Sequence, residues 1–223
     1  MLYLLLAVPI ITAVICLLPL EQQQWESANR LGAVLTGVLA GYCSLNAFWI
    51  EKASPGHAFL VIDGLSSVFV LTIGLVGTIS SLYAVNYLRR DQESGEMEDR
   101  RIGHFYALLH LFIASMYLAV LADSLGVMWV AIEATTIVSA LLVGFYGNKA
   151  ALEAAWKYII ICTVGIAFAM FGIIITFHAA QQLLGTGHFS LSWRVIYPLA
   201  SQLDPSLMKL AFIFILIGYG TQA

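Results

Sequence analysis

The sequence predicts an all-α protein, a polytopic bundle of transmembrane helices with six full spans and a partial seventh. Of its 223 residues, 61% are hydrophobic and only 10% are charged, whereas an ordinary soluble domain has about 25% charged residues. Too few polar side chains are present to cover a water-exposed surface, and the mean hydropathy is +0.89. Lipid must therefore surround most of the chain.

The spans follow from the polar interruptions, because a helix needs roughly 20 apolar residues to cross about 30 Å of hydrocarbon. The first run lacks a positive flank and a cleavage site, which favours a retained span over a signal peptide. The last run ends without a polar flank, so we expect the front part of a longer protein. The predicted spans are residues 2–20, 31–50, 65–88, 104–122, 124–146 and 152–178, with a partial one from Leu207 to Ala223.

Polar segments between the spans carry further structural signals. Asp63 directly precedes the third span, and an aspartate in that place is typical of a helix N-cap. The stretch 181–206 holds Trp193 and Tyr197 among leucines, which favours an interfacial helix. Asp204-Pro205-Ser206 predicts the start of the last helix.

Lysine and arginine counts orient the bundle, because cytoplasmic loops carry the excess of positive charge. With the N-terminus outside, six fall on the cytoplasmic side and three on the outer side. We therefore expect a multi-pass membrane protein with its N-terminus outside. The segment 89–101, with four arginines and five acids, is expected to be a solvated loop or a cytoplasmic partner contact. The cytoplasmic group is Arg30, Arg89, Arg90, Arg100, Arg101 and Lys149, and the outer group is Lys52, Arg194 and Lys209.

The composition and the motifs exclude several classes of function. A net charge of -3 provides no basic surface for nucleic acid. The sequence has no Gly-rich phosphate loop, no nucleophile elbow, no dinucleotide fingerprint and no cysteine quartet. Its cysteines, Cys16, Cys43 and Cys162, lie inside apolar runs and are expected to be small buried hydrophobic residues. We therefore expect no metal, no cofactor, no catalytic residue and no redox chemistry on this chain.

Glu133 is the most informative residue, because an ionisable side chain at the centre of a span costs about 2.5 to 3.5 kcal/mol on insertion scales. It is the tenth residue of the span 124–146, some 15 Å from the nearer helix end, too deep for a short side chain to reach water. This position favours a place in an ion path. The alternative is a protonated glutamate that bonds to a threonine or a carbonyl group and fixes helix packing.

Lys157 and His110 are weaker candidates for the same path. Glu153 precedes Lys157 by four residues, and such a pair stabilises a helix end without any transport role. However, the helices of Lys157 and Glu133 leave the same short turn, which puts the two residues about 9 Å apart in height, a gap that one or two waters could bridge. His110 could relay a proton, although a lone histidine in an apolar helix is more often a packing residue.

Four segments carry a family resemblance: Trp129–Thr136, Ala151–Tyr158, Cys162–Ala167 and Ile217–Thr221. Together they resemble the antiporter-like membrane subunits shared by complex I and energy-converting hydrogenases. Within that family the likeness is greatest to the hydrogenase-4 branch of formate hydrogenlyase-type complexes. The resemblance covers nearly the whole chain.

The resemblance implies a subunit of about fourteen helices with two inverted five-helix repeats, of which this chain is the front half. Residues 1–103 would be three leading helices with a cytoplasmic loop, and residues 104–223 a first repeat that is incomplete at its C-terminal end. In this family a glutamate of the fifth helix, here Glu133, pairs with a lysine of a broken seventh helix. The matching residue here is Gln222, which cannot titrate, so either Lys157 supplies the cation or this half-channel is altered.

The implied function is proton translocation by a membrane subunit of a complex I-related oxidoreductase, of NADH:quinone or hydrogenase and formate hydrogenlyase type. Its path would contain Glu133, Lys157, His110 and Gln222. The implied partners are other membrane subunits, peripheral hydrogenase or dehydrogenase subunits and lipid, and the implied location is a prokaryotic inner membrane. Two alternatives stay open, a stand-alone multisubunit sodium/proton antiporter and a non-conducting scaffold for redox subunits.

Overall fold

Helices account for nearly all of the described chain. The computed structural model describes residues 1–49, 59–95, 101–185 and 191–222, and within these ranges it contains no β-sheet, so the predicted all-α fold is confirmed. In chain order the helices are α1 (Leu2–Leu17), α2 (Gln22–Trp49), α3 (Gly64–Glu93), α4 (Arg101–Leu121), α5 (Leu125–Val143), α6 (Lys149–Leu184), α7 (Trp193–Ile196), the 3₁₀ helix η1 (Tyr197–Gln202) and α8 (Pro205–Gly220).

Among the described residues, four helices are long and apolar enough to cross a membrane, namely α3, α4, α5 and α6, and each overlaps a predicted span. α1 and α8 are shorter apolar helices, so the count of six spans and a partial seventh stays a prediction. The predicted ends at Ile50 and Ala223, and the predicted loop charges Lys52 and Arg100, lie outside the described residues.

The helix α6 is longer than its predicted span 152–178. It has 36 residues, which corresponds to about 54 Å. The predicted span ends where polar residues begin to appear in the sequence. The helix continues past that point because the alanines, glutamines and leucines of 179–184 are good helix formers. The helix ends at Leu184, and the next residue, Gly185, has a φ of 73°, which suits glycine.

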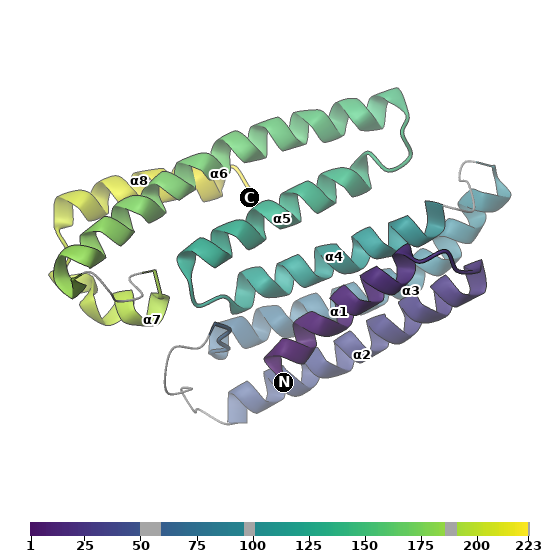
Figure 1. Ribbon diagram of the computed structural model, residues 1–223, viewed down its shortest axis with the longest axis horizontal. Coiled ribbons are helices and arrows are strands. Elements are labelled where there is room, and N and C mark those ends of the chain that lie inside the picture. Colours follow the sequence, from purple (N-terminus) through teal and green to yellow (C-terminus); the bar gives the residue numbers. More distant parts are fainter. Residues whose placement is uncertain (50–58, 96–100, 186–190, 223) are drawn as a thin grey trace.

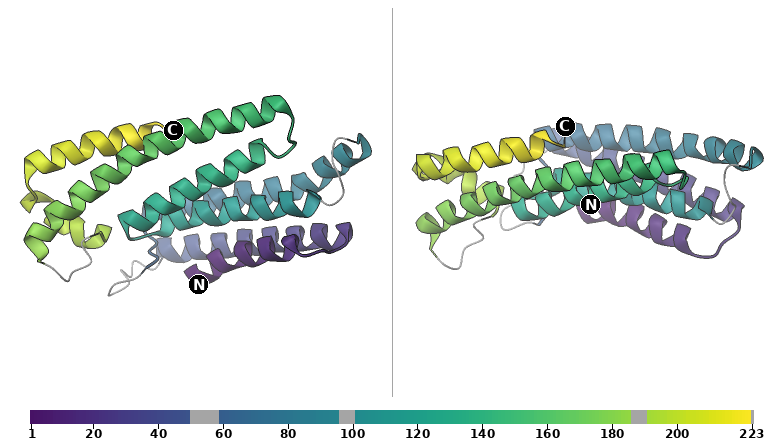
Figure 2. Two further views of the ribbon diagram at one scale, coloured as in Figure 1. Left: turned by 45° about the horizontal axis from the view of Figure 1, so that its top comes forward. Right: turned by 90° about the horizontal axis from the view of Figure 1, so that it is seen from above.

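The helices lie side by side, with α5 between two groups (Figures 1 and 2). One group contains α1 to α4, and the other contains α6 and α8. α8 runs back along α6 and the two touch through their backbones, because a Cβ atom added at Gly218 would lie 2.3 Å from the amide nitrogen of Ala169. Small residues are typical of such close contacts between membrane helices.

Two predicted helix starts are confirmed at one end of the bundle. The Asp63 carboxylate accepts a hydrogen bond of 2.7 Å from the amide of Ser66, and Asp204 accepts from the amides of Ser206 and Leu207. The predicted interfacial stretch contains α7 and η1, and its Trp193 and Tyr197 side chains are exposed. The backbone of Trp193 also donates to the carbonyl of Asp123, at 2.9 Å, which ties this segment to the turn between α4 and α5.

Candidate functional site

Polar side chains line one face of α5. Trp129, Glu133, Thr136 and Ser139 are separated by four, three and three residues, so they share one side of the helix. The indole of Trp129 donates to the carbonyl oxygen of Ile166 on α6, at 2.8 Å. This face of α5 is therefore directed toward α6, and Glu133 lies within it.

The Glu133 carboxyl group has one bonded oxygen and one without a partner. Its Oε1 atom accepts a hydrogen bond of 3.0 Å from the hydroxyl of Thr163 on α6. Its Oε2 atom is buried and has no hydrogen-bond partner among the described residues. An unpaired buried polar atom costs about 1 to 3 kcal/mol, so Oε2 is the atom at which a proton or a water molecule would be stabilised.

Gln222 joins the three helices around Glu133. Its Oε1 atom accepts from the Thr136 hydroxyl at 2.9 Å, and its Nε2 atom donates to the carbonyl oxygen of Cys162 at 3.2 Å. Thr136 is three residues after Glu133, and Cys162 adjoins Thr163, so both bonds lie within about one helical turn of the Glu133 carboxylate. The structure thus brings together two predicted site residues, Glu133 and Gln222.

A glycine on α6 makes this arrangement possible. A Cβ atom added at Gly165 would lie 1.7 Å from the Oγ1 atom of Thr221, which is far inside van der Waals contact. Only glycine lets the end of α8 approach α6 so closely. The position of Gln222, which follows Thr221, therefore depends on Gly165.

Lys157 lies on a different face of α6. Its ammonium group is 2.6 Å from the Glu153 carboxylate, and the two side chains are 70% and 60% exposed. Lys157 is six residues before Thr163, which corresponds to about 9 Å along the axis and about 120° around it. Among the described contacts, Lys157 therefore meets Glu153 and does not touch Glu133.

His110 belongs to another helix contact. The imidazole is fully buried, and its Nε2 atom lies 3.1 Å from Oδ1 of Asn29 on α2. No described contact joins His110 to Glu133, which faces α6. A water connection between these two residues, as the sequence suggested, stays a prediction.

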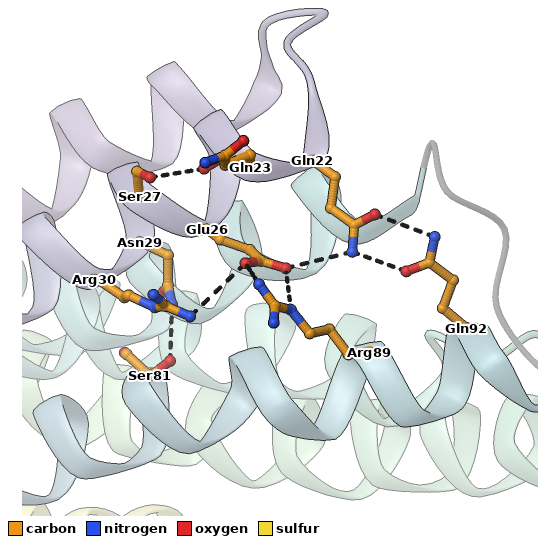
Figure 3. A network of polar contacts seen from close by, with 9 residues as sticks. All are labelled: Gln22, Gln23, Glu26, Ser27, Asn29, Arg30, Ser81, Arg89 and Gln92. Carbon is orange, nitrogen blue, oxygen red and sulfur yellow. Dashed lines mark hydrogen bonds and ion pairs between the residues drawn. The ribbon is translucent and has the colours of Figure 1, made fainter.

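An ion-pair cluster between α2 and α3 was missed in the sequence (Figure 3). The Glu26 side chain is 4% exposed and is paired with Arg89, with Arg30 3.8 Å away. Arg89 donates to it through Nε at 2.8 Å and also through Nη2. From the sequence, Arg30 and Arg89 were expected only as charges on the cytoplasmic side. The spacing of four residues between Glu26 and Arg30 was the available signal.

The cysteines behave as predicted, since Cys16, Cys43 and Cys162 are all buried and free. Within the part of the chain that the structure describes, no group of three or more histidine, cysteine, aspartate or glutamate residues has an arrangement that could hold a metal ion.

The second half of the chain has a clear family match. Residues 122–223 match the family described as NADH:quinone oxidoreductase/Mrp antiporter, transmembrane. The match covers a little under half of the chain. The antiporter-family segment contains α5, α6, α8 and all the contacts of Glu133 and Gln222 described above.

Full-length relatives agree with the family match. The chain is 35% identical over 175 residues to the hydrogenase-4 component F homolog of Methylacidiphilum infernorum, covering 78% of this chain and 37% of the relative. It is 38% identical over 144 residues to NADH-quinone oxidoreductase subunit L of Mycobacterium tuberculosis, covering 64% of this chain and 22% of the relative. The chain thus spans well under half the length of these antiporter-like relatives.

A solved structure shows the same fold. A chain of the membrane-bound sulfane sulfur reductase, an archaeal respiratory membrane complex, superposes with a TM-score of 0.79 at 19% identity, over 97% of this chain and 43% of that one. The likeness in fold to this chain therefore covers the leading helices as well as residues 122–223.

Proposed function

We propose that this chain is part of a proton-translocating membrane subunit of a complex I-related oxidoreductase, and that Glu133 is the central proton-binding group of its path. The family match of residues 122–223 supports the class of protein. The observation that carries the role of Glu133 is its Oε2 atom in the middle of α5, which is buried and has no hydrogen-bond partner within the described part of the chain.

In this proposal, proton binding at Glu133 responds to nearby charge. A positive charge that approaches a carboxyl group stabilises its ionised form, and withdrawal of that charge from a low-dielectric site favours the protonated form. Gln222 holds the family's lysine position with a neutral amide, so it can orient groups through hydrogen bonds but cannot supply the charge. We assign that role to Lys157, which would reach the site through water after leaving Glu153.

The subunit is proposed to work within a larger assembly. Peripheral hydrogenase or quinone-linked dehydrogenase subunits would carry out the electron transfer, and further membrane subunits would flank this one in the inner membrane. The proposed topology has six spans and a partial seventh with the N-terminus outside, in line with the excess of positive charge at the α1–α2, α3–α4 and α5–α6 ends.

The test is Glu133→Gln in the full-length protein within its assembled complex. Glutamine keeps the hydrogen bond with Thr163 but cannot exchange a proton. We expect proton pumping in inverted membrane vesicles to fall by about a hundredfold or more, because a positioned proton-transfer group contributes about 10²–10⁴-fold. Assembly should be unchanged. Glu21→Gln, which removes an exposed carboxylate before α2, is the control and should pump normally.

The same vesicles distinguish the alternative functions. A sodium/proton antiporter would exchange cations without any electron donor. A non-conducting scaffold would leave pumping by the Glu133→Gln complex at the wild-type rate, and that result would reject the proposed role.

A further inference from the structure

The contact between α2, α3 and α4 contains a second polar cluster, centred on Asn29. Its amide nitrogen donates to the carbonyl oxygen of Ser81 on α3, at 2.8 Å (Figure 3). Its amide oxygen lies 3.1 Å from Nε2 of His110 on α4. Asn29, Ser81 and His110 each have an exposed fraction of 0%, so the cluster lies in the interior.

The hydrogen bonds determine which nitrogen of His110 carries its proton. Because the amide nitrogen of Asn29 is bonded to Ser81, the amide oxygen faces His110 and the Nε2 atom must donate. The Nδ1 atom of the neutral imidazole then carries the free lone pair. It is the atom of His110 that can bind a further proton.

Three polar atoms of this cluster are buried without a hydrogen-bond partner among the described residues. They are His110 Nδ1, the Ser81 hydroxyl and the hydroxyl of Tyr106. Leaving one such atom unpaired costs about 1 to 3 kcal/mol, and buried water is the usual way in which proteins avoid this cost. Three together indicate a site that binds water.

A short polar route connects the cluster to the aqueous phase. A groove of about 430 Å³ lies between α2 and α3, and Glu26 and Arg89 line it. Asn29 follows Glu26 by three residues and so lies one turn deeper on the same face of α2. Tyr106 is four residues before His110 on α4 and interacts electrostatically with Glu26 and Arg89. Tyr106 is therefore about one turn from His110 along α4, and near enough to the groove to interact with the charges that line it.

The route closes on its far side, where α2 and α3 come into direct contact. The Thr78 hydroxyl donates to the carbonyl of Ala33 at 3.1 Å. A Cβ atom added at Gly37 would lie 2.4 Å from that hydroxyl oxygen, and one added at Gly74 would lie 2.5 Å from the Cβ of Ala40. No water can pass between α2 and α3 where they lie this close, so the route is closed on that side.

We propose that α2, α3 and α4 enclose a pocket that binds water, opens at the groove of Glu26 and Arg89, and connects Nδ1 of His110 with the aqueous phase. This inference is independent of the role of Glu133. The titratable groups around the groove and the cluster are Glu26 and Arg30 from α2, Arg89 and Glu93 from α3, and Tyr106 and His110 from α4, with Cys16 of α1 packed near Tyr106.

Radiolytic labelling tests the pocket without any substitution. X-ray radiolysis in ¹⁸O water adds oxygen to side chains that contact bound water, and the full-length protein in lipid nanodiscs is the sample. Tyr106 and Tyr117 form a matched pair, because both are 0% exposed and neither hydroxyl has a hydrogen-bond partner among the residues that the structure describes. Tyr117 lies beyond the closed contact, beside Gly74. We expect Tyr106 to be modified about tenfold faster, since bound water is the oxygen source. Equal rates would overturn the proposal.

Thiol accessibility gives a second measurement. Ser81→Cys and Val70→Cys place a thiol at two fully buried positions on α3, one in the pocket and one in an apolar cluster. The three native cysteines are replaced by alanine. Because methanethiosulfonates react with the thiolate, which forms only in contact with water, we expect the Ser81→Cys protein to react about tenfold faster. If the two variants react at the same rate, the interior is dry and the proposal is wrong.

Discussion

Replacing Lys157 by methionine separates a proton partner from a helix-end ion pair. We expect Lys157→Met to lower pumping by about tenfold or more in the assembled complex, because the site then lacks its cation. Stability should change by less than about 1 kcal/mol, since an exposed pair contributes little. Glu153→Gln is the control, because it frees Lys157 and should leave pumping intact. Normal pumping by Lys157→Met would show that this lysine only pairs with Glu153.

The chemistry of the candidate site was predictable residue by residue, but the contacts were not. A carboxylate in the middle of an apolar run identifies Glu133 from the sequence alone. Thr163 donates a hydrogen bond to one carboxyl oxygen of Glu133, and the other oxygen has no partner among the described residues. This arrangement depends on the rotation of α5 against α6, which the periodicity of the sequence does not determine. The Glu26 and Arg89 pair was missed because its members are 63 residues apart.

At the scale of helices, the close approach of α8 to α6 should be sensitive to one methyl group. Gly165→Ala would place its Cβ against Thr221, so α8 must move away and take Gln222 with it. We expect a loss of about 1–3 kcal/mol in stability, typical of overpacking, measured as a lower apparent Tm in nanodiscs. Gly220→Ala is the matched control, because nothing lies within 4 Å of its added Cβ. Equal Tm values for the two variants would contradict the close contact.

The start of α3 provides a prediction that depends on pH. Hydrogen bonding from the Ser66 amide lowers the pKa of Asp63 below its ordinary value of 3.8. A lowered carboxyl pKa stabilises the fold above the unfolded value, and this contribution is lost as the pH falls through the folded value. Asp63→Ala should therefore cost about 1 kcal/mol at pH 7, and the difference in apparent Tm should shrink as the pH falls below about 3.8. A difference that stays constant down to pH 2 would exclude the ionised cap.

At the scale of the whole molecule, the charge distribution predicts the orientation. Gln23 and Ser201 are exposed at opposite ends of the bundle. In the full-length protein, a membrane-impermeant maleimide should label Ser201→Cys in intact cells and Gln23→Cys only after the membrane is opened. The opposite pattern would place the N-terminus inside. The native cysteines are buried and should contribute little background.

The sequence by itself determined that this protein is helical and lies in lipid, because hydropathy and span length depend on composition alone. It also identified Glu133 and the cap residues Asp63 and Asp204, since each stands out against its local neighbours. Only the tertiary structure decided that Gln222 bridges three helices, that Lys157 pairs with Glu153, and that His110 belongs to a separate cluster. These contacts depend on how the helices rotate and pack against one another. The sequence does not reveal that packing, because the surface of a helix that faces lipid and the surface that faces another helix can be equally apolar.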